Sequence, residues 1–180
     1  MDAVTDILAF AATHADYWTE FLSGQDYSAV LSGDEMKALE AADRHVREGI
    51  YDLLLECGKR LEEKLKGDGV VTRNFQRDAT ARNRVVRIDP PKGFGDRLYG
   101  LEFALVPDDK NEKILLYPRL VVKKGSIDKV KSKLASQKTA FQPDDYYLYG
   151  EGVPLEKDAS FATLAGTAAT TLAAIFQGAK

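Results

Sequence analysis

Hydrophobic residues recur every three or four positions through the first part of the chain, which is the spacing of amphipathic helices. The first such stretch predicts a helix over residues 2–22. The second predicts a long helix that starts after Ser32, where Ser32 and Glu35 have the spacing of a capping box, and that ends at Gly67. Its apolar stripe consists of Met36, Leu39, Val46, Ile50, Leu53, Leu54, Cys57, Leu61 and Leu65. We expect the two helices to pack antiparallel as a hairpin.

Short apolar segments replace this pattern after residue 70 and predict strands over residues 84–88, 98–106 and 114–124. In the first of them, Val86 and Ile88 are expected on one face and Val85 and Arg87 on the other. The last two strands are joined by a seven-residue polar turn, which is too short for a crossover helix, so we expect them to pair antiparallel. Pro118 interrupts the third strand and indicates an edge or a bulge there.

The last third of the chain returns to helices. Ser126 is a candidate N-cap for a short helix to Gln137, residues 146–149 add a strand, and a final helix from Asp158 or Ser160 continues to Gln177. The order of elements predicts an α+β fold: an N-terminal two-helix hairpin, a small, mainly antiparallel β-sheet, one short basic helix and a C-terminal Ala/Thr-rich helix.

The length of 180 residues predicts a single domain over residues 1–180. A sub-boundary is expected near residues 67–70, between a helical hairpin (1–66) and the sheet with its helices (71–180), because composition and periodicity both change there. The acidic N-terminus lacks the positive region of a secretory signal, and no apolar run is long enough to span a bilayer. With a single cysteine, these features favour a cytoplasmic protein without a membrane partner.

Charge is distributed unevenly along the chain. Residues 1–70 carry 7 Lys/Arg against 15 Asp/Glu, residues 71–138 carry 16 against 8, and residues 139–180 carry 2 against 5. A strongly basic middle therefore lies inside a protein with an overall formal charge of −3. Such a block indicates either an anionic partner or acidic residues within the same chain that neutralise it.

The basic middle contains a segment rich in arginine. Its members are Arg73, Arg77, Arg82, Arg84, Arg87 and Arg97, with Phe75, Phe94 and Tyr99 interleaved. Guanidinium groups suit bidentate phosphate contacts, and the aromatic rings could stack on the bases of single-stranded nucleic acid. The alternative is that these arginines cover the outer face of a sheet or pair with acids of the long helix, such as Asp43, Glu48, Asp52, Glu56, Glu62 and Glu63.

Two further groups of residues could take part in chemistry or binding. Lys123 and Lys124 precede the short basic helix and could contact an anion at its start, although lysines are also common on exposed helix faces. Glu102, in the middle of a predicted strand, could be a ligand of Mg²⁺ in a nuclease together with a nearby aspartate such as Asp96. The expected spacing is poorly met, and a solvent-facing or paired glutamate is the competing interpretation.

The sequence holds no nucleophile elbow, P-loop or dinucleotide glycine fingerprint, so no cofactor and no metal site are expected. His14 and His45 could meet across the helical hairpin, and Cys57 lies on an apolar stripe where a small core residue is expected. The final helix, rich in alanine and threonine, could pack closely against the hairpin or against a second copy of the chain.

Taken together, these observations predict a non-enzymatic binding protein that engages an anionic partner, either a nucleic acid or an acidic protein surface. The expected contacts are Arg73, Arg77, Arg82, Arg84 and Arg87, with Lys123 and Lys124 as outer contacts. Two alternatives stay open: a Mg²⁺-dependent nuclease or phosphodiesterase that uses Glu102 and a nearby aspartate, and an oligomeric, for example homodimeric, structural or interaction subunit with internally paired charges.

Overall fold

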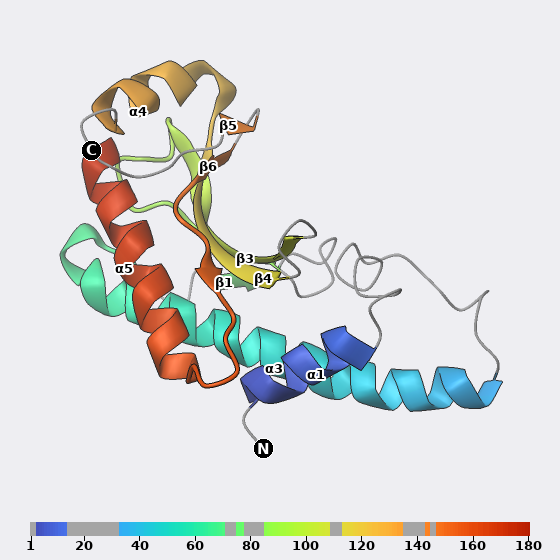
Figure 1. Ribbon diagram of the computed structural model, residues 1–180. Coiled ribbons are helices and arrows are strands. Elements are labelled where there is room, and N and C mark those ends of the chain that lie inside the picture. The colour runs from blue at the N-terminus through green and yellow to red at the C-terminus, as the bar shows by residue number, and fades with distance from the viewer. Residues whose placement is uncertain are drawn as a thin grey trace.

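The computed structural model describes residues 3–13, 33–70, 75–77, 85–108, 113–134, 143–144 and 147–180, and it has the predicted α+β architecture. Its helices are α1 (Ala3–Thr13), α3 (Gly33–Lys64), α4 (Ile127–Leu134) and α5 (Phe161–Ala179), with the 3-10 turns η1 (Lys66–Asp68) and η3 (Lys124–Ser126). In Figure 1, α5 crosses the C-terminal part of α3 and runs beside the sheet, while α1 lies against the middle of α3.

The described strands form one antiparallel sheet in the order β1-β2-β3-β4-β6-β5, and β7 also pairs with β4. They are β1 (Phe75–Arg77), β2 (Val85–Ile88), β3 (Leu98–Asp108), β4 (Lys113–Val122), β5 (Pro143–Asp144), β6 (Tyr147–Tyr149) and β7 (Val153–Pro154). The predicted antiparallel pairing on either side of the turn at 107–113 is confirmed by the β3–β4 hairpin. The sequence did not predict β1, β5 and β7, because a strand of two or three residues is too short to show a period of two.

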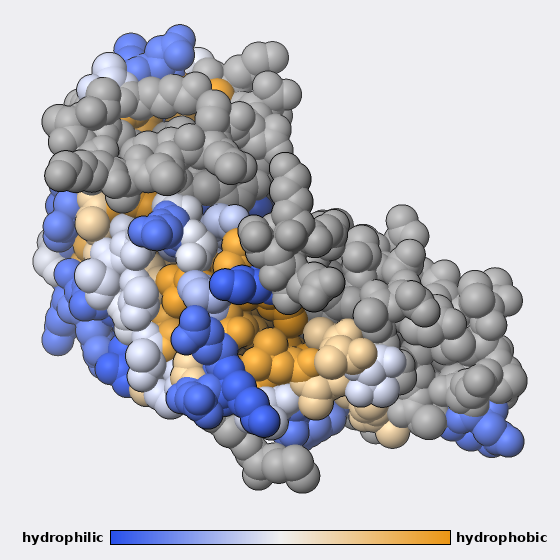
Figure 2. Space-filling model, viewed as in Figure 1, coloured by the Kyte–Doolittle hydropathy of each residue, from blue (hydrophilic) through white to orange (hydrophobic). Residues whose placement is uncertain are grey.

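One face of the sheet shares its core with α3 and α5. Leu101, Phe103 and Leu105 of β3 point into this core, as do Val86 and Ile88 of β2, which confirms the face predicted for them. The helices contribute residues such as Leu54, Cys57 and Leu61 from α3 and Leu172, Ile175 and Phe176 from α5. Each fully buried side chain of this size contributes about 1.5–3 kcal/mol to folding. Figure 2 shows hydrophobic residues reaching the surface between the β7–α5 connection and α1.

Helix α1 packs antiparallel to α3, as predicted for the N-terminal hairpin. Val4, Ile7 and Phe10 are its buried residues, and Asp6 Oδ2 lies 2.9 Å from His45 Nε2 on α3. The further part of the predicted first helix, residues 14–22, and the predicted capping residue Ser32 lie outside the described residues.

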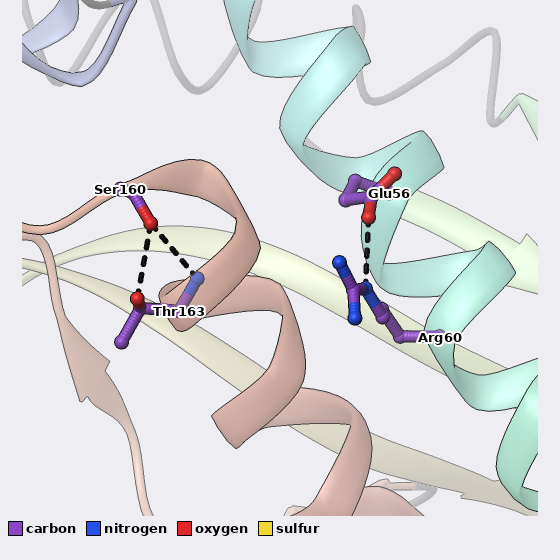
Figure 3. Close-up of polar contacts among 4 residues, drawn as sticks. All are labelled: Glu56, Arg60, Ser160 and Thr163. Carbon is purple, nitrogen blue, oxygen red and sulfur yellow. Dashed lines mark hydrogen bonds and ion pairs between the residues drawn. The ribbon is translucent and has the colours of Figure 1, made fainter.

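Helix α5 begins where a serine caps it. The Ser160 hydroxyl accepts a hydrogen bond of 3.2 Å from the Thr163 backbone N–H, which satisfies one of the free donors of the first turn (Figure 3). On α3, Arg60 Nε donates to Glu56 Oε1 at 2.8 Å, one helical turn away (Figure 3). The hydrogen bond and negative charge of Glu56 raise the pKa of Arg60. Ser160 was one of the two predicted starts of α5, and the structure selects it.

Pro118 lies in the interior strand β4, so the prediction of an edge or a bulge at this residue is wrong. β4 pairs with β6 at residues 119–121 and with β7 at residues 115–116, and Pro118 falls between these two short pairings. A backbone N–H is not required at that gap, so proline is tolerated. The Pro118 carbonyl still accepts a hydrogen bond of 2.8 Å from the Gly150 N–H.

The short basic helix α4 begins at Ile127, as predicted, but its predicted cap Ser126 has a different role. Ser126 is the last residue of η3, and its backbone N–H donates to the Lys123 carbonyl at 2.8 Å, so it does not act as an N-cap of α4. A 3-10 turn that leads directly into a helix satisfies the first backbone donors by itself. Residues 135–137 of the predicted helix lie outside the described residues.

Candidate functional site

Glu102, at the centre of β3, is the one polar or charged residue that is buried among the residues the structure describes. The register of the sheet places it between Arg87 of β2 and Arg119 of β4, so the three residues form one row across three neighbouring strands. We call these three residues the arginine row. Cross-strand neighbours on one face lie about 4.5–5.5 Å apart at Cβ, which brings these long side chains into contact.

Both carboxylate oxygens of Glu102 are bonded to guanidinium groups. Arg87 Nε and Nη2 each lie 2.5 Å from Oε1, and Arg119 Nε lies 2.6 Å from Oε2. The side chain of Glu102 is 0% exposed, that of Arg119 11% and that of Arg87 33%. Charge-assisted bonds of this kind offset the cost of burying the carboxylate. Because one carboxylate serves two guanidinium groups, the row keeps one formal positive charge.

The arginine row lies on the face of the sheet opposite the helices. Residues alternate in direction along a strand, and the neighbours of the core residues Leu101, Phe103 and Leu105 are Glu102 and Ala104. We call this side the second face, and its described members are Arg87, Glu102, Ala104, Val106, Leu115, Tyr117, Arg119 and Val121. Ala104 and Val121 are buried on it, whereas Arg87, Tyr117 and Arg119 are partly exposed.

A break in the β3–β4 register lies beside the arginine row. Leu98 pairs with Val122 and Gly100 with Val121, which leaves Tyr99 without a Cα partner. Gly100 is required here, because a Cβ at this position would lie 2.9 Å from Arg87 Cγ and 2.9 Å from the Ile88 carbonyl oxygen. The aliphatic part of Arg87 therefore lies directly against the backbone of β3.

Lys123 extends the second face beyond the end of β4. Its backbone is extended, so it follows Arg119 and Val121 in the two-residue alternation of the strand. Its ammonium group donates to the Gly95 carbonyl and lies 5.3 Å from the centre of the Tyr99 ring. The basic side chain predicted as an outer contact is thus held next to Tyr99, four residues beyond Arg119 along the chain.

The loop before β3 is anchored to α5 by an aromatic contact. The rings of Phe94 and Phe176 meet edge to face, with centroids 4.8 Å apart and an angle of 61° between the planes. The guanidinium carbon of Arg97 lies 4.7 Å from the Phe94 ring centre. Phe94, predicted as a stacking surface for bases, therefore uses its ring to hold this loop in place.

The structure brings together only some of the basic residues that the sequence singled out. Arg87 and Lys123 lie on the second face, whereas Arg73, Arg82 and Arg84 lie outside the described residues. Arg77 falls in β1 and Lys124 in η3, and their side chains lie outside what the structure describes.

The carboxylate partner of Arg87 is Glu102 of the neighbouring strand β3. The sequence allowed two interpretations of this glutamate, a metal ligand and a solvent-facing or paired carboxylate, and the structure shows it paired. Arg119 was not among the predicted site residues. One signal could have revealed the pair. Asp108 and Lys113 pair with each other next to the turn of the β3–β4 hairpin. Glu102 lies six residues before Asp108, and Arg119 lies six residues after Lys113. A symmetric hairpin therefore places Glu102 opposite Arg119.

The geometry around Glu102 favours an ion-pair role over the binding of a metal ion. Its two oxygens already accept bonds from guanidinium groups. Asp96, the aspartate considered with it, has a side chain that is 78% exposed and that lies 3.9 Å from Arg97. Within the described ranges, no group of three or more His, Cys, Asp or Glu residues could hold a metal ion.

Cys57 is fully buried in α3, where the sequence predicted a core residue. Burial away from water raises the pKa of its thiol, and the nearby charge of Glu56 raises it further. The nucleophilic thiolate is therefore scarce at neutral pH.

We expect Cys57 to be unreactive toward thiol reagents in the folded protein and to react only when the chain opens. Because the chain has a single cysteine, the labelling rate in increasing urea should follow the unfolding curve measured by circular dichroism. Rapid labelling in native buffer, at the rate of the denatured chain, would contradict the buried position of this residue.

A shallow groove of about 460 Å³ lies along the outer side of α5, on the helix predicted to favour close packing. It is lined by small residues of α5, among them Gly166 and Thr170, and by Lys64 of α3. Two of its hydroxyl groups are used within the helix, because Thr170 donates to the Gly166 carbonyl at 2.7 Å and Thr171 to the Thr167 carbonyl at 3.1 Å. Self-association through this helix stays a prediction.

Comparisons with protein-family profiles, curated proteins and solved structures found no match to this chain. Among the described helices, none combines the length and the apolar character needed to cross a membrane.

Proposed function

We propose that this chain is a non-enzymatic binding protein that engages an anionic partner, a nucleic acid or an acidic protein surface, on the second face of its sheet. The observation that carries the proposal is the arginine row, in which one buried carboxylate holds two guanidinium groups. Together with Lys123, which lies four residues beyond Arg119 along the chain, the row forms a strip of described side chains with three positive charges and one negative charge. An anion that approaches these positive charges gains favourable charge interactions.

The buried carboxylate supports this proposal in a second way. Glu102 fixes the position of Arg87 and Arg119 before any partner arrives, so less side-chain freedom is lost on binding. Arg87, at 33% exposure, is the member of the row that is most accessible to a partner. The low-dielectric surroundings of a half-buried guanidinium also make its interactions stronger than those of a fully solvated lysine.

Binding of two anionic probes, a short single-stranded oligonucleotide and an acidic peptide, tests the proposal. Arg87→Gln and Lys123→Gln each remove one positive charge from the strip, and Arg87→Gln keeps an amide donor toward Glu102. We expect each to weaken binding of at least one probe by roughly tenfold, the effect of losing one hydrogen bond to a charged group. Fluorescence anisotropy at about 50 mM salt is the measurement.

Lys129→Gln is the matched control, because Lys129 is exposed on α4, outside the second face, and its loss changes the net charge by the same amount. This variant should bind like the wild type. The proposal fails if neither probe binds at low salt, or if the Lys129 variant weakens binding as much as the two variants in the strip.

The two alternatives from the sequence differ in their expected results. The ion pairs of the arginine row also agree with an interaction subunit whose charges are paired internally. Such a subunit would self-associate in solution and bind neither probe. A Mg²⁺-dependent nuclease would cleave nucleic acid in the presence of Mg²⁺ and lose that activity in Glu102→Gln. Solution mass and a cleavage assay therefore separate both from the binding protein proposed above.

A further inference from the structure

Tyr99 stands out beside the arginine row, because it is the exposed large hydrophobic residue of the described chain, with 53% of its surface accessible. Its position in the register break of β3 explains this exposure. A residue inserted into a strand without a partner is turned away from the regular pattern of the sheet, and such bulges often redirect a side chain at a functional site.

One cationic group lies close to the Tyr99 ring, and a second basic side chain packs against the next residue of β3. The Lys123 ammonium is held 5.3 Å from the ring centre and is fixed there by its bond to the Gly95 carbonyl. The aliphatic part of Arg87 lies against Gly100, the residue that follows Tyr99 in the chain. An aromatic ring beside a fixed cation on a basic surface is the combination with which proteins hold single-stranded nucleic acid, since bases stack on the ring and phosphates contact the cations.

The remaining apolar residues of the second face argue against an acidic protein as the partner. Ala104 is 1% exposed and Val121 4%, and Val106, Leu115 and Tyr117 are only partly exposed, so Tyr99 is the exposed large apolar side chain on the described part of this face. A stable protein interface needs a wide, well-packed apolar centre of many residues, whereas a nucleobase needs one accessible ring.

We infer that the anionic partner is single-stranded nucleic acid and that one of its bases stacks on Tyr99. This inference rests on the proposed function and adds the class of partner to it. The phosphates on either side of the stacked base contact Lys123 and Arg87. Stacking does not read the identity of a base, so binding tolerates many sequences.

The test compares three probes of similar charge: an oligothymidine, an abasic strand with the same number of phosphates, and an acidic peptide. We expect oligothymidine to bind more tightly than the abasic strand by roughly 5- to 150-fold, the range for one stacked base. Tyr99→Ala should abolish this preference and leave the affinity for the abasic strand unchanged. Tyr99→Phe keeps the ring and should keep the preference.

The inference is overturned if Tyr99→Ala has no effect on oligothymidine binding, or if the acidic peptide binds more tightly than both strands. In either case, weaker binding by Arg87→Gln and Lys123→Gln would leave the proposed function standing. If no probe binds at low salt, the proposed function itself fails. Because Tyr99 is exposed, its replacement should leave the thermal unfolding of the protein close to that of the wild type.

Discussion

Arg119→Ala is expected to lower the free energy of unfolding by about 3–5 kcal/mol, because it leaves the buried carboxylate of Glu102 without the guanidinium group at its Oε2 atom. Arg87→Ala should cost less, about 1.5–3 kcal/mol, since Arg87 is 33% exposed and water can replace part of its contact with Glu102. Urea unfolding followed by circular dichroism measures both values.

A triple variant separates the cost of an unpaired charge from the net value of the row. Replacing Arg87, Glu102 and Arg119 together by Leu, Leu and Met removes all three charges and leaves apolar side chains beside Ala104 and Val121. This variant should be close to the wild type in stability, or exceed it, because well-packed apolar residues often replace a buried ion network without loss. An Arg119→Ala variant within about 1 kcal/mol of the wild type would contradict the description of the row as a buried network.

Phe176→Ala is expected to cost about 3–5 kcal/mol, the range for truncating a fully buried aromatic residue. Phe176 also carries the edge-to-face contact that fastens the Phe94 loop to α5. We therefore expect faster amide hydrogen exchange at Arg97 and Leu98, whose N–H groups donate to the Phe94 carbonyl. Global stability comes from urea unfolding, and local opening comes from exchange measured by mass spectrometry.

Phe176→Leu is the control for this prediction. It keeps most of the buried apolar volume and should cost about 1.5 kcal/mol. A double-mutant cycle with Phe94→Leu should give a coupling of about 0.5–1.5 kcal/mol, which is the value of an aromatic pair beyond its buried area. A coupling near zero would show that Phe176 stabilises α5 without holding the loop.

The long elements of this fold could be predicted from the sequence because their periods are long enough to be visible. α3, α5 and the β3–β4 hairpin each repeat their apolar positions several times, and they appear close to the expected residues. The short strands β5 and β7 consist of two residues each and depend on pairing with β6 and β4, which no local pattern encodes. The prediction of an edge or a bulge at Pro118 was wrong for the same reason. The gap between β6 and β7 that tolerates the proline is a tertiary feature.

The candidate site was predictable in part. Charge distribution pointed to Arg87 and Lys123, and both lie on one face of the sheet. A paired Glu102 was one of the two interpretations, but its partners could not be named. The sequence does not state which side chains a strand register brings together, and Arg119 lies outside the arginine-rich segment. Tyr99 was selected for its residue type; its exposure depends on a register break that a strand pattern alone does not reveal.

The most direct test of the central claim is the salt dependence of oligonucleotide binding by the wild type and by Arg87→Gln. The logarithm of the binding constant should fall linearly with the logarithm of salt concentration, and the slope should become shallower by about 0.7 in the variant, the value for one lost phosphate contact on a single strand. Lys129→Gln should keep the wild-type slope. Equal slopes for the wild type and Arg87→Gln, or binding that salt does not weaken, would contradict an anion-binding role for the second face.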